Sequence, residues 1–465
     1  KPKPPLVTPL QVEPRVVLIE IDGLAMSILT EYLGTAASRG SKRALHRVVD
    51  ASAVGGSSTW RHAVALQAVT VLPSLPTPAS TTMLTGVAPR SHGVLRISDA
   101  LASDAVTLHE VLRASRKTSA SAGFGSARGA TFIADGKTDE ERVGSLLGWM
   151  ATVDPGPTLL TLRFDSLLKA RLSGGSKATE AALAAVDESL FELLFGRGHM
   201  MGPNTYVVLT SGLGVAPRSD ATRVIAREQV LAQEPQLAGT DLHLAGGLLW
   251  MNHPDRQTAA AMAKLRLGNK QLLETVLTVT EAGLRIVDRH SGLPLPLGDA
   301  PEKSVLLAER VLEFAQPGYL VGLPHPDFVF KGDDDDPTSP SAWATIGGSS
   351  ESESLIPLVI AGASISPGLD LKSLEPLRLM DVAPTVLGLL GLDRSALHAS
   401  AGRNLVPLLG AQNARPEPQL LACREAGLRV RGTRVNVNLE ERLTAVENAC
   451  TAVLFKTVSR EAASE

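Results

Sequence analysis

The chain has 465 residues, a formal net charge of −3 at pH 7 and 44% hydrophobic residues. This composition is typical of a globular protein with a sizeable core, built as one large α/β fold or as about three domains. The near-neutral charge and the aromatic content of 3% argue against a nucleic-acid-binding protein, which usually has a basic face. No apolar run reaches the ~18 residues of a membrane-spanning helix, so we predict no transmembrane segment.

Residues 1–14 form the first predicted unit, an extended tether. It opens with Lys-Pro-Lys-Pro-Pro, a composition that favours a stiff and extended chain. The first residue is Lys1 and not Met, which removal of a secretory signal or simple trimming would both explain. We therefore expect a secreted, periplasmic or cell-surface protein that is tethered near a membrane through this end.

Apolar, β-rich runs next predict the buried strands of a mostly parallel sheet. These strands span residues 15–22, 158–164, 205–211 and 355–362, and predicted helices span 107–114, 177–195 and 380–390. Alternating strands and helices predict an α/β fold with helices on both faces of the sheet. Ligands bind at the carboxyl ends of such strands, where Asp22, Asp165 and Gly212 are expected to lie.

Two later regions are less regular. Residues 216–315 predict an inserted or peripheral α/β subdomain, and residues 411–465 predict a C-terminal appendage. Between them, Asp333–Asp336 form a contiguous acidic run, which favours a solvated loop because calcium ligands must be spaced to wrap an ion. The appendage carries the two cysteines, Cys423 and Cys450, either as free thiols or as a disulfide that would indicate an oxidising compartment.

Several motifs, in their order and spacing over residues 15–410, resemble the alkaline phosphatase superfamily, especially its phosphodiesterase and sulfatase-like branches. The motifs lie at residues 17–24, 72–86 with 89–93, 107–112, and 380–390 with 402–407. The resemblance implies a three-layer sandwich and a site with two metal ions that clamp the oxygens of a phosphoryl or sulfuryl group. It also implies a nucleophile at a helix N-terminus, where backbone N–H groups favour an anion.

The positions that correspond to this machinery are largely without suitable side chains. The nucleophile position is Pro76, which has neither a hydroxyl nor a thiol, and Ser80 replaces the arginine of the sulfatase-like pattern. The ligand positions of the strand-end motifs retain Asp22 and Asp165. The other ligand positions correspond to Lys169, Gly212, Leu213 and Ile346, and none of these side chains ligates a divalent cation.

We therefore predict a pseudoenzyme: a non-catalytic protein of this fold that acts as a binding or structural module for an unknown partner or ligand. No cofactor and no bound metal are expected, and nucleic acid is not an expected partner. Lys169 lies four residues after Asp165, and we expect its ammonium group to pair with that carboxylate and to relieve repulsion between Asp22 and Asp165.

The alternative is a hydrolase of phosphate, phosphodiester or sulfate esters with a rebuilt site. It would use Thr77 or Ser74 as the nucleophile and two zinc or manganese ions held by Asp22, Asp165 and the carboxylates of Asp333–Asp336. Against this, Thr77 precedes Pro78 and fits the N-cap of a helix, and Ser74 fits a loop hydroxyl.

Overall fold

A computed structural model describes most of residues 13–409. The gaps in this range are residues 36, 50–62, 103, 135, 154–155, 199, 203, 219–221, 253–254, 297–301, 332–343, 363–364, 366–376, 398–399 and 401. Most of the predicted tether, the acidic run Asp333–Asp336, both cysteines and the predicted appendage 411–465 lie outside the described residues.

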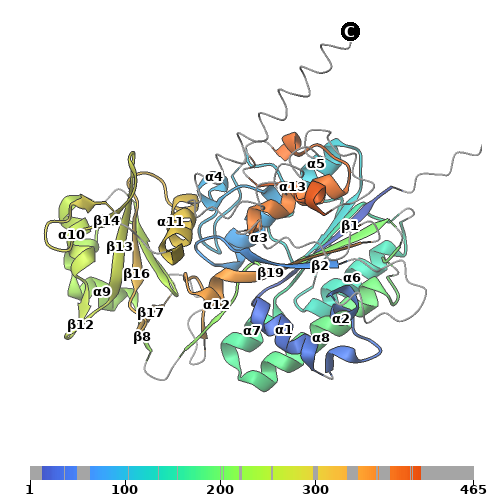
Figure 1. The fold of residues 1–465 in the computed structure, drawn as a ribbon, viewed down its shortest axis with the longest axis horizontal. Coiled ribbons are helices and arrows are strands. Elements are labelled where there is room, and N and C mark those ends of the chain that lie inside the picture. The colour runs from blue at the N-terminus through green and yellow to red at the C-terminus, as the bar shows by residue number, and fades with distance from the viewer. Residues whose placement is uncertain are drawn as a thin grey trace, which may run out of the picture.

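An eight-stranded sheet with the strand order β20-β2-β19-β6-β1-β5-β3-β4 forms the centre of the molecule (Figure 1). Its strands are β1 (Arg15–Ile21), β2 (Ala63–Val69), β3 (Ser119–Ala122), β4 (Phe132–Ala134), β5 (Leu159–Phe164), β6 (Thr205–Thr210), β19 (Leu355–Gly362) and β20 (Leu377–Arg378). The central strand β1 pairs in parallel with β5 and β6, whereas β19 runs antiparallel to both of its neighbours. The predicted mostly parallel sheet is confirmed.

Helices cover both faces of this sheet, because side chains alternate between the two faces along each strand. Val16 and Leu18 of β1 pack with α3, α5 and α13, whereas Val17 and Ile19 pack with α1, α2, α6 and α8 on the other face. The helices are α1 (Met26–Gly34), α2 (Leu45–Val49), α3 (Pro76–Thr85), α4 (Pro89–His92), α5 (Leu108–Ala114), α6 (Asp139–Met150), α7 (Ser166–Ser173), α8 (Ser176–Leu194), α12 (Glu351–Ser354) and α13 (Val382–Leu389). The predicted three-layer α/β architecture is confirmed.

A second, six-stranded antiparallel sheet lies beside the first and builds the subdomain (Figure 1). Its strands are β9 (Leu242–Ala245), β10 (Leu248–Met251), β13 (Leu273–Thr280), β14 (Gly283–Val287), β15 (Pro294–Leu295) and β16 (Leu320–Pro324). Its helices are α9 (Arg227–Gln233), α10 (Arg256–Lys264) and α11 (Glu302–Phe314). Because β16 lies inside this sheet, the subdomain reaches beyond the range 216–315 that the sequence suggested.

Four further strands form two short two-stranded pairs beside the subdomain. In one pair, β8 (Arg223–Ile225) lies beside β17 (Phe328–Phe330), and in the other β7 (Ala216–Pro217) lies beside β18 (Ala344–Thr345). Separately, β11 (Arg266–Leu267) and β12 (Lys270–Gln271) form a short hairpin. Among the residues described, none of the helices combines the length and the hydropathy required to traverse a bilayer.

Candidate functional site

The candidate site lies at the carboxyl ends of β1 and β5. Asp22 follows β1, and Glu20 projects from the same face of that strand because it lies two residues earlier. In the parallel pairing, Glu20 lies opposite Arg163 of β5, and Asp165 follows β5. Strand register therefore brings Glu20, Asp22 and Arg163 together on the face of the sheet that α3 covers.

The Arg163 guanidinium binds the retained strand-end aspartate directly. Its Nε and Nη2 groups donate to Asp22 Oδ2 at 2.8 Å and 2.6 Å. Its Nε lies 4.0 Å from Glu20 Oε2, which also accepts a hydrogen bond of 2.7 Å from Ser80 Oγ. Asp22 and Glu20 have no exposed surface, and the Arg163 side chain is 17% exposed. The guanidinium is thus the counterion of two fully buried carboxyl groups.

One of these two carboxyl groups binds its proton more tightly than a free carboxyl group does. Burial, and then the charge of Asp22, raise the pKa of Glu20 well above its usual value. Glu20 Oε1 and Asp22 Oδ1 are both buried and accept no hydrogen bond from another described group. Whenever Glu20 is protonated, its O–H group supplies a donor to this pair and can satisfy both oxygens.

Asp165 forms a second ion-pair group nearer the surface. Lys169 Nζ donates to Asp165 Oδ1 at 2.9 Å, which confirms the predicted pairing one helical turn apart on α7. Arg142 of α6 donates to Asp165 Oδ2 at 3.1 Å, and these two cations lower the pKa of Asp165. Whether Lys169 relieves repulsion between Asp22 and Asp165 stays a prediction, and Arg163 is the cation that binds Asp22 directly.

The hydroxyl groups proposed as replacement nucleophiles hold other parts of the backbone. Helix α3 begins at Pro76 with Leu75 as its N-cap, so the predicted N-cap role of Thr77 is wrong, and Thr77 donates instead to the Ile97 carbonyl at 3.2 Å. Pro76 takes the first helical position because that position needs no N–H donor. Ser74 donates to the Gly348 carbonyl at 2.8 Å and accepts from Arg310 at 3.1 Å.

The positions where the resemblance implies the remaining ligands lie close to the site without contributing a donor atom. A Cβ atom at Gly212 would lie 2.2 Å from Glu20 Oε1 and 3.2 Å from Asp22 Oδ1, so the two carboxyl groups fill the space beside this glycine. Leu213 and Ile346 are buried in one hydrophobic cluster that also includes Leu72. Both side chains therefore make the surroundings of the site apolar.

The described residues around Asp22 and Asp165 do not fit a pair of divalent metal ions. Within the described part of the chain, no three His, Cys, Asp or Glu side chains are grouped closely enough to hold a metal ion. A metal at Asp22 Oδ2 would meet the positive guanidinium that already binds this oxygen. The donor set at Lys169, Gly212, Leu213 and Ile346 offers no neutral nitrogen or carboxylate oxygen.

Glu20 and Arg163 are the site residues that the sequence analysis did not identify. Each lies two residues before a strand-end aspartate, inside an otherwise apolar strand. A charged residue in a strand buried on both faces needs a partner, so this symmetrical spacing was the signal for a pair across β1 and β5.

Comparison with solved structures identifies the fold. Human ectonucleotide pyrophosphatase/phosphodiesterase 5 superimposes with a TM-score of 0.55 at 14% identity, over 85% of this chain and 99% of that chain. The murine protein gives a TM-score of 0.53 at 14% identity, over 81% of this chain and 95% of that chain. Phosphonoacetate hydrolase from Sinorhizobium meliloti 1021, in complex with phosphonoformate, gives a TM-score of 0.52 at 16% identity. This match covers 83% of this chain and 96% of that chain. The chain therefore has the fold of the alkaline phosphatase superfamily.

Sequence comparison adds no further relative. No family model matches the chain, and no curated protein matches it.

Proposed function

We propose that this chain is a non-catalytic protein with the alkaline phosphatase fold, which serves as a binding or structural module. The observation that carries this proposal is the guanidinium of Arg163, which lies 2.6 Å from the carboxylate of Asp22. Arginine stays protonated at any physiological pH, so this cation is permanent.

Electrostatics favour an internal cation over a bound metal at this position. Two unit charges attract or repel strongly at short range when water is excluded, and Asp22 and Glu20 are fully buried. The guanidinium pairs with Asp22, and the raised pKa of Glu20 favours its neutral form beside this pair. The attraction that would draw a divalent ion into the site is therefore already satisfied.

The alternative, a hydrolase with a rebuilt site, has less support from the described residues. Its candidate nucleophiles are Thr77 and Ser74, and both hydroxyls donate to backbone carbonyls. Neither hydroxyl has a histidine or carboxylate among its recorded hydrogen-bond partners, so neither has a base that would remove its proton.

The test combines metal content with ester hydrolysis. The purified protein is exposed to excess zinc or manganese, dialysed, and analysed by elemental mass spectrometry. It is then assayed with p-nitrophenyl phosphate, bis-p-nitrophenyl phosphate and p-nitrophenyl sulfate. We expect no stoichiometric metal, and product formation no faster than with the Thr77→Ala and Ser74→Ala variants. About two ions per chain, with turnover that either variant abolishes, would overturn the proposal.

We also propose that the protein acts outside the cytosol, in keeping with the extended N-terminal composition and the cysteine pair. Titration of thiols in protein from its natural source tests this point. A disulfide between Cys423 and Cys450 supports an oxidising compartment, and two reactive thiols contradict it.

A further inference from the structure

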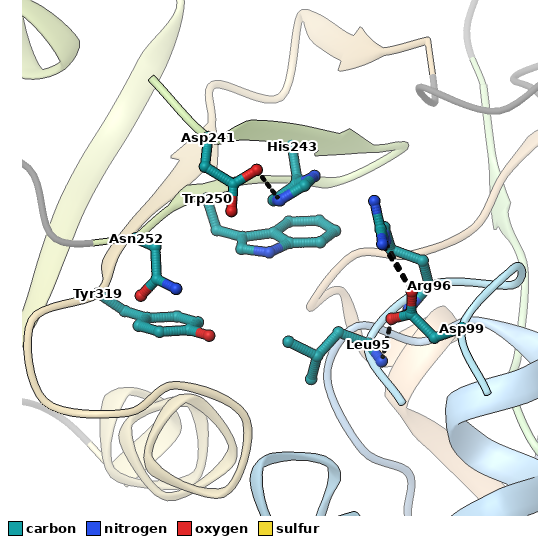
Figure 2. Close-up of a pocket in the computed structure, with 8 residues that line it drawn as sticks. All are labelled: Leu95, Arg96, Asp99, Asp241, His243, Trp250, Asn252 and Tyr319. Carbon is teal, nitrogen blue, oxygen red and sulfur yellow. Dashed lines mark hydrogen bonds and ion pairs between the residues drawn. The ribbon is translucent and has the colours of Figure 1, made fainter. Parts of the chain in front are cut away.

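A pocket of about 160 Å³ lies between the main domain and the subdomain (Figure 2). Leu95, Arg96 and Asp99 line it from the loop after α4, and residues of the second sheet line the opposite side. The pocket is smaller than the ~300–1,000 Å³ of sites for drug-sized ligands, so its size fits a single small ring. None of its lining residues belongs to the site around Asp22.

Two aromatic rings give the pocket a rigid wall. Trp250 of β10 is 2% exposed and meets Phe314 of α11 edge-on, with centroids 5.4 Å apart and an interplanar angle of 88°. Tyr319 meets the same phenyl ring at 6.2 Å and 84°. Edge-to-face contacts of this kind hold rings in fixed orientations, so the polar groups on Trp250 and Tyr319 are directed before any ligand arrives.

The ionisable groups of the pocket are already paired with one another. Arg96 Nη2 lies 2.8 Å from Asp99 Oδ1, and the backbone N–H groups of Leu95 and Arg96 donate to Asp99 Oδ2 at 2.9 Å. On the opposite side, His243 Nε2 lies 2.9 Å from Asp241 Oδ1. A ligand with a net charge would have to displace one of these internal partners, so the lining favours a neutral ligand.

Three neutral polar groups remain available in the pocket. Asn252 Oδ1 is buried and accepts no hydrogen bond from any described donor, although acceptors in such positions are nearly always satisfied. The indole N–H of Trp250 has no acceptor within the described part of the chain, and Figure 2 shows it on the ring edge that faces the open space. Burial, and then the charge of Asp241, raise the pKa of Tyr319 against a hydrogen bond from Asn252, so its hydroxyl keeps its proton and can still donate it to a ligand.

We propose that this pocket binds one ring of a neutral polyhydroxyl compound, such as a single sugar residue or a cyclic polyol. Hydroxyl groups both donate and accept, so one can donate to Asn252 Oδ1 while its neighbours accept from Trp250 and Tyr319. The rigid aromatic wall adds contact area for the C–H groups of the ring. This assignment is independent of the proposed loss of catalysis, because the two sites share no residue.

The test measures binding of D-glucose, D-galactose, D-mannose and myo-inositol to the full chain. Saturation-transfer NMR detects contact, and tryptophan fluorescence gives the affinity. We expect at least one of these compounds to bind, and Trp250→Phe, Tyr319→Phe or Asn252→Ala to weaken binding about tenfold or more. Trp149→Phe is the matched control, because Trp149 lies in α6, stacked on Phe132 with centroids 4.8 Å apart and outside the pocket.

Three results would overturn this assignment. The first is the absence of binding by all four compounds, which leaves the pocket as a solvent-filled gap. The second is binding that all three pocket variants leave unchanged while circular dichroism shows them folded. The third is a clear preference for glucuronate or glucosamine over glucose, because a charged ligand contradicts the internal pairing of the lining. Tyr319→Phe removes only a hydroxyl, so it stays informative if the larger changes unfold the protein.

Discussion

Arg163 places a covalently attached cation against the carboxylate of Asp22. A guanidinium on a buried strand is ordinarily costly, because burial removes its hydration. Here the charge of Asp22, and then that of Glu20 in its ionised form, more than offset this cost, and the pKa of Arg163 is raised above its usual value. The pair is strong only while both partners are present, since removing one leaves the other buried and uncompensated.

Arg163→Met should therefore destabilise the protein by about 3–5 kcal/mol. Urea unfolding at pH 7 measures the change. Lys169→Met is the matched control, because Lys169 also pairs with a strand-end aspartate but its side chain is 57% exposed. An exposed pair of this kind contributes only about 0.2–1 kcal/mol. Equal losses in the two variants would contradict the assignment of Arg163 as the counterion.

Glu20→Gln should alter how stability depends on pH. The folded chain keeps a proton on Glu20 above pH 4.5, the ordinary pKa, where the unfolded chain releases it. The folded state then binds more protons, so stability falls as the pH rises through this window toward the raised pKa. Glutamine stays neutral, can still accept from Ser80 and can donate to Asp22, so the variant should lose this decline.

The measurement is the free energy of unfolding in urea at intervals between about pH 5 and about pH 8. The free energy of unfolding of the wild type should decrease relative to that of Glu20→Gln as the pH rises across this range. Parallel curves would show that Glu20 is ionised in the folded state as it is in the unfolded state.

The retained aspartates and the Lys169 pair could be predicted, because they depend on local spacing. Asp22 follows a run of apolar residues, and Lys169 lies one helical turn from Asp165. The contact between Glu20 and Arg163 depends on the register of two strands far apart in the chain. Register is set by the whole sheet, so the residues alone did not reveal which cation meets Asp22.

At the scale of elements, the end of β6 illustrates how tightly the carboxyl groups are enclosed. Gly212→Ala adds a methyl group 2.2 Å from Glu20 Oε1 and 3.1 Å from Ala79 Cβ, in a region without free space. Such overpacking should destabilise the protein by about 1–3 kcal/mol, as measured by urea unfolding. Gly125→Ala is the control, because a Cβ atom there meets no atom within 4 Å, and its stability should stay close to wild type.

Most elements could be predicted because their apolar residues follow a clear pattern. The residue at which an element begins was harder to predict. The predicted strand 355–362 and the helix 177–195 match β19 and α8 (Ser176–Leu194) almost residue for residue. The start of α3 was placed too late, because the Thr-Pro pair suggested a cap while Pro76 itself can occupy the first turn. Helix ends depend on one or two local contacts, and several residues can satisfy them.

At the scale of the whole molecule, one buried side chain joins the subdomain to the main domain. Arg310 of α11 is 3% exposed and donates to the carbonyls of Thr70 and Val71 and to the hydroxyls of Ser354 and Ser74. Burial lowers its pKa to about 10, so it remains charged at neutral pH. The subdomain is therefore fixed to the loop that precedes α3.

Arg310→Met should loosen this junction and lower stability by about 3 kcal/mol or more, because several buried acceptors lose a charged donor. Differential scanning calorimetry should show a lower melting temperature, and limited proteolysis should show faster cleavage in the subdomain. The control is Arg285→Met in β14, where the arginine donates one exposed hydrogen bond of 3.3 Å. An identical melting profile for Arg310→Met and wild type would contradict the role of Arg310.

The overall architecture could be predicted from the alternation of strands and helices together with the motif order. The extent of the subdomain could not, because β16 returns to the second sheet only after α11, and its apolar run Leu320–Pro324 gives no sign of which sheet it joins. The pocket between the loop after α4 and the second sheet was likewise unpredictable, since its walls come from segments more than a hundred residues apart.

The glycine at position 212 has an evolutionary consequence. A lineage that acquired an acidic side chain there would put a third carboxyl group into a space that Glu20 and Asp22 already fill. It would also have to discard Arg163 in the same step, since this cation occupies the oxygen that a metal would need. If the scaffold has lost a metal site, as proposed above, each single substitution on that path would lower stability before activity returned, so the loss would act as a ratchet that later mutations cannot easily reverse.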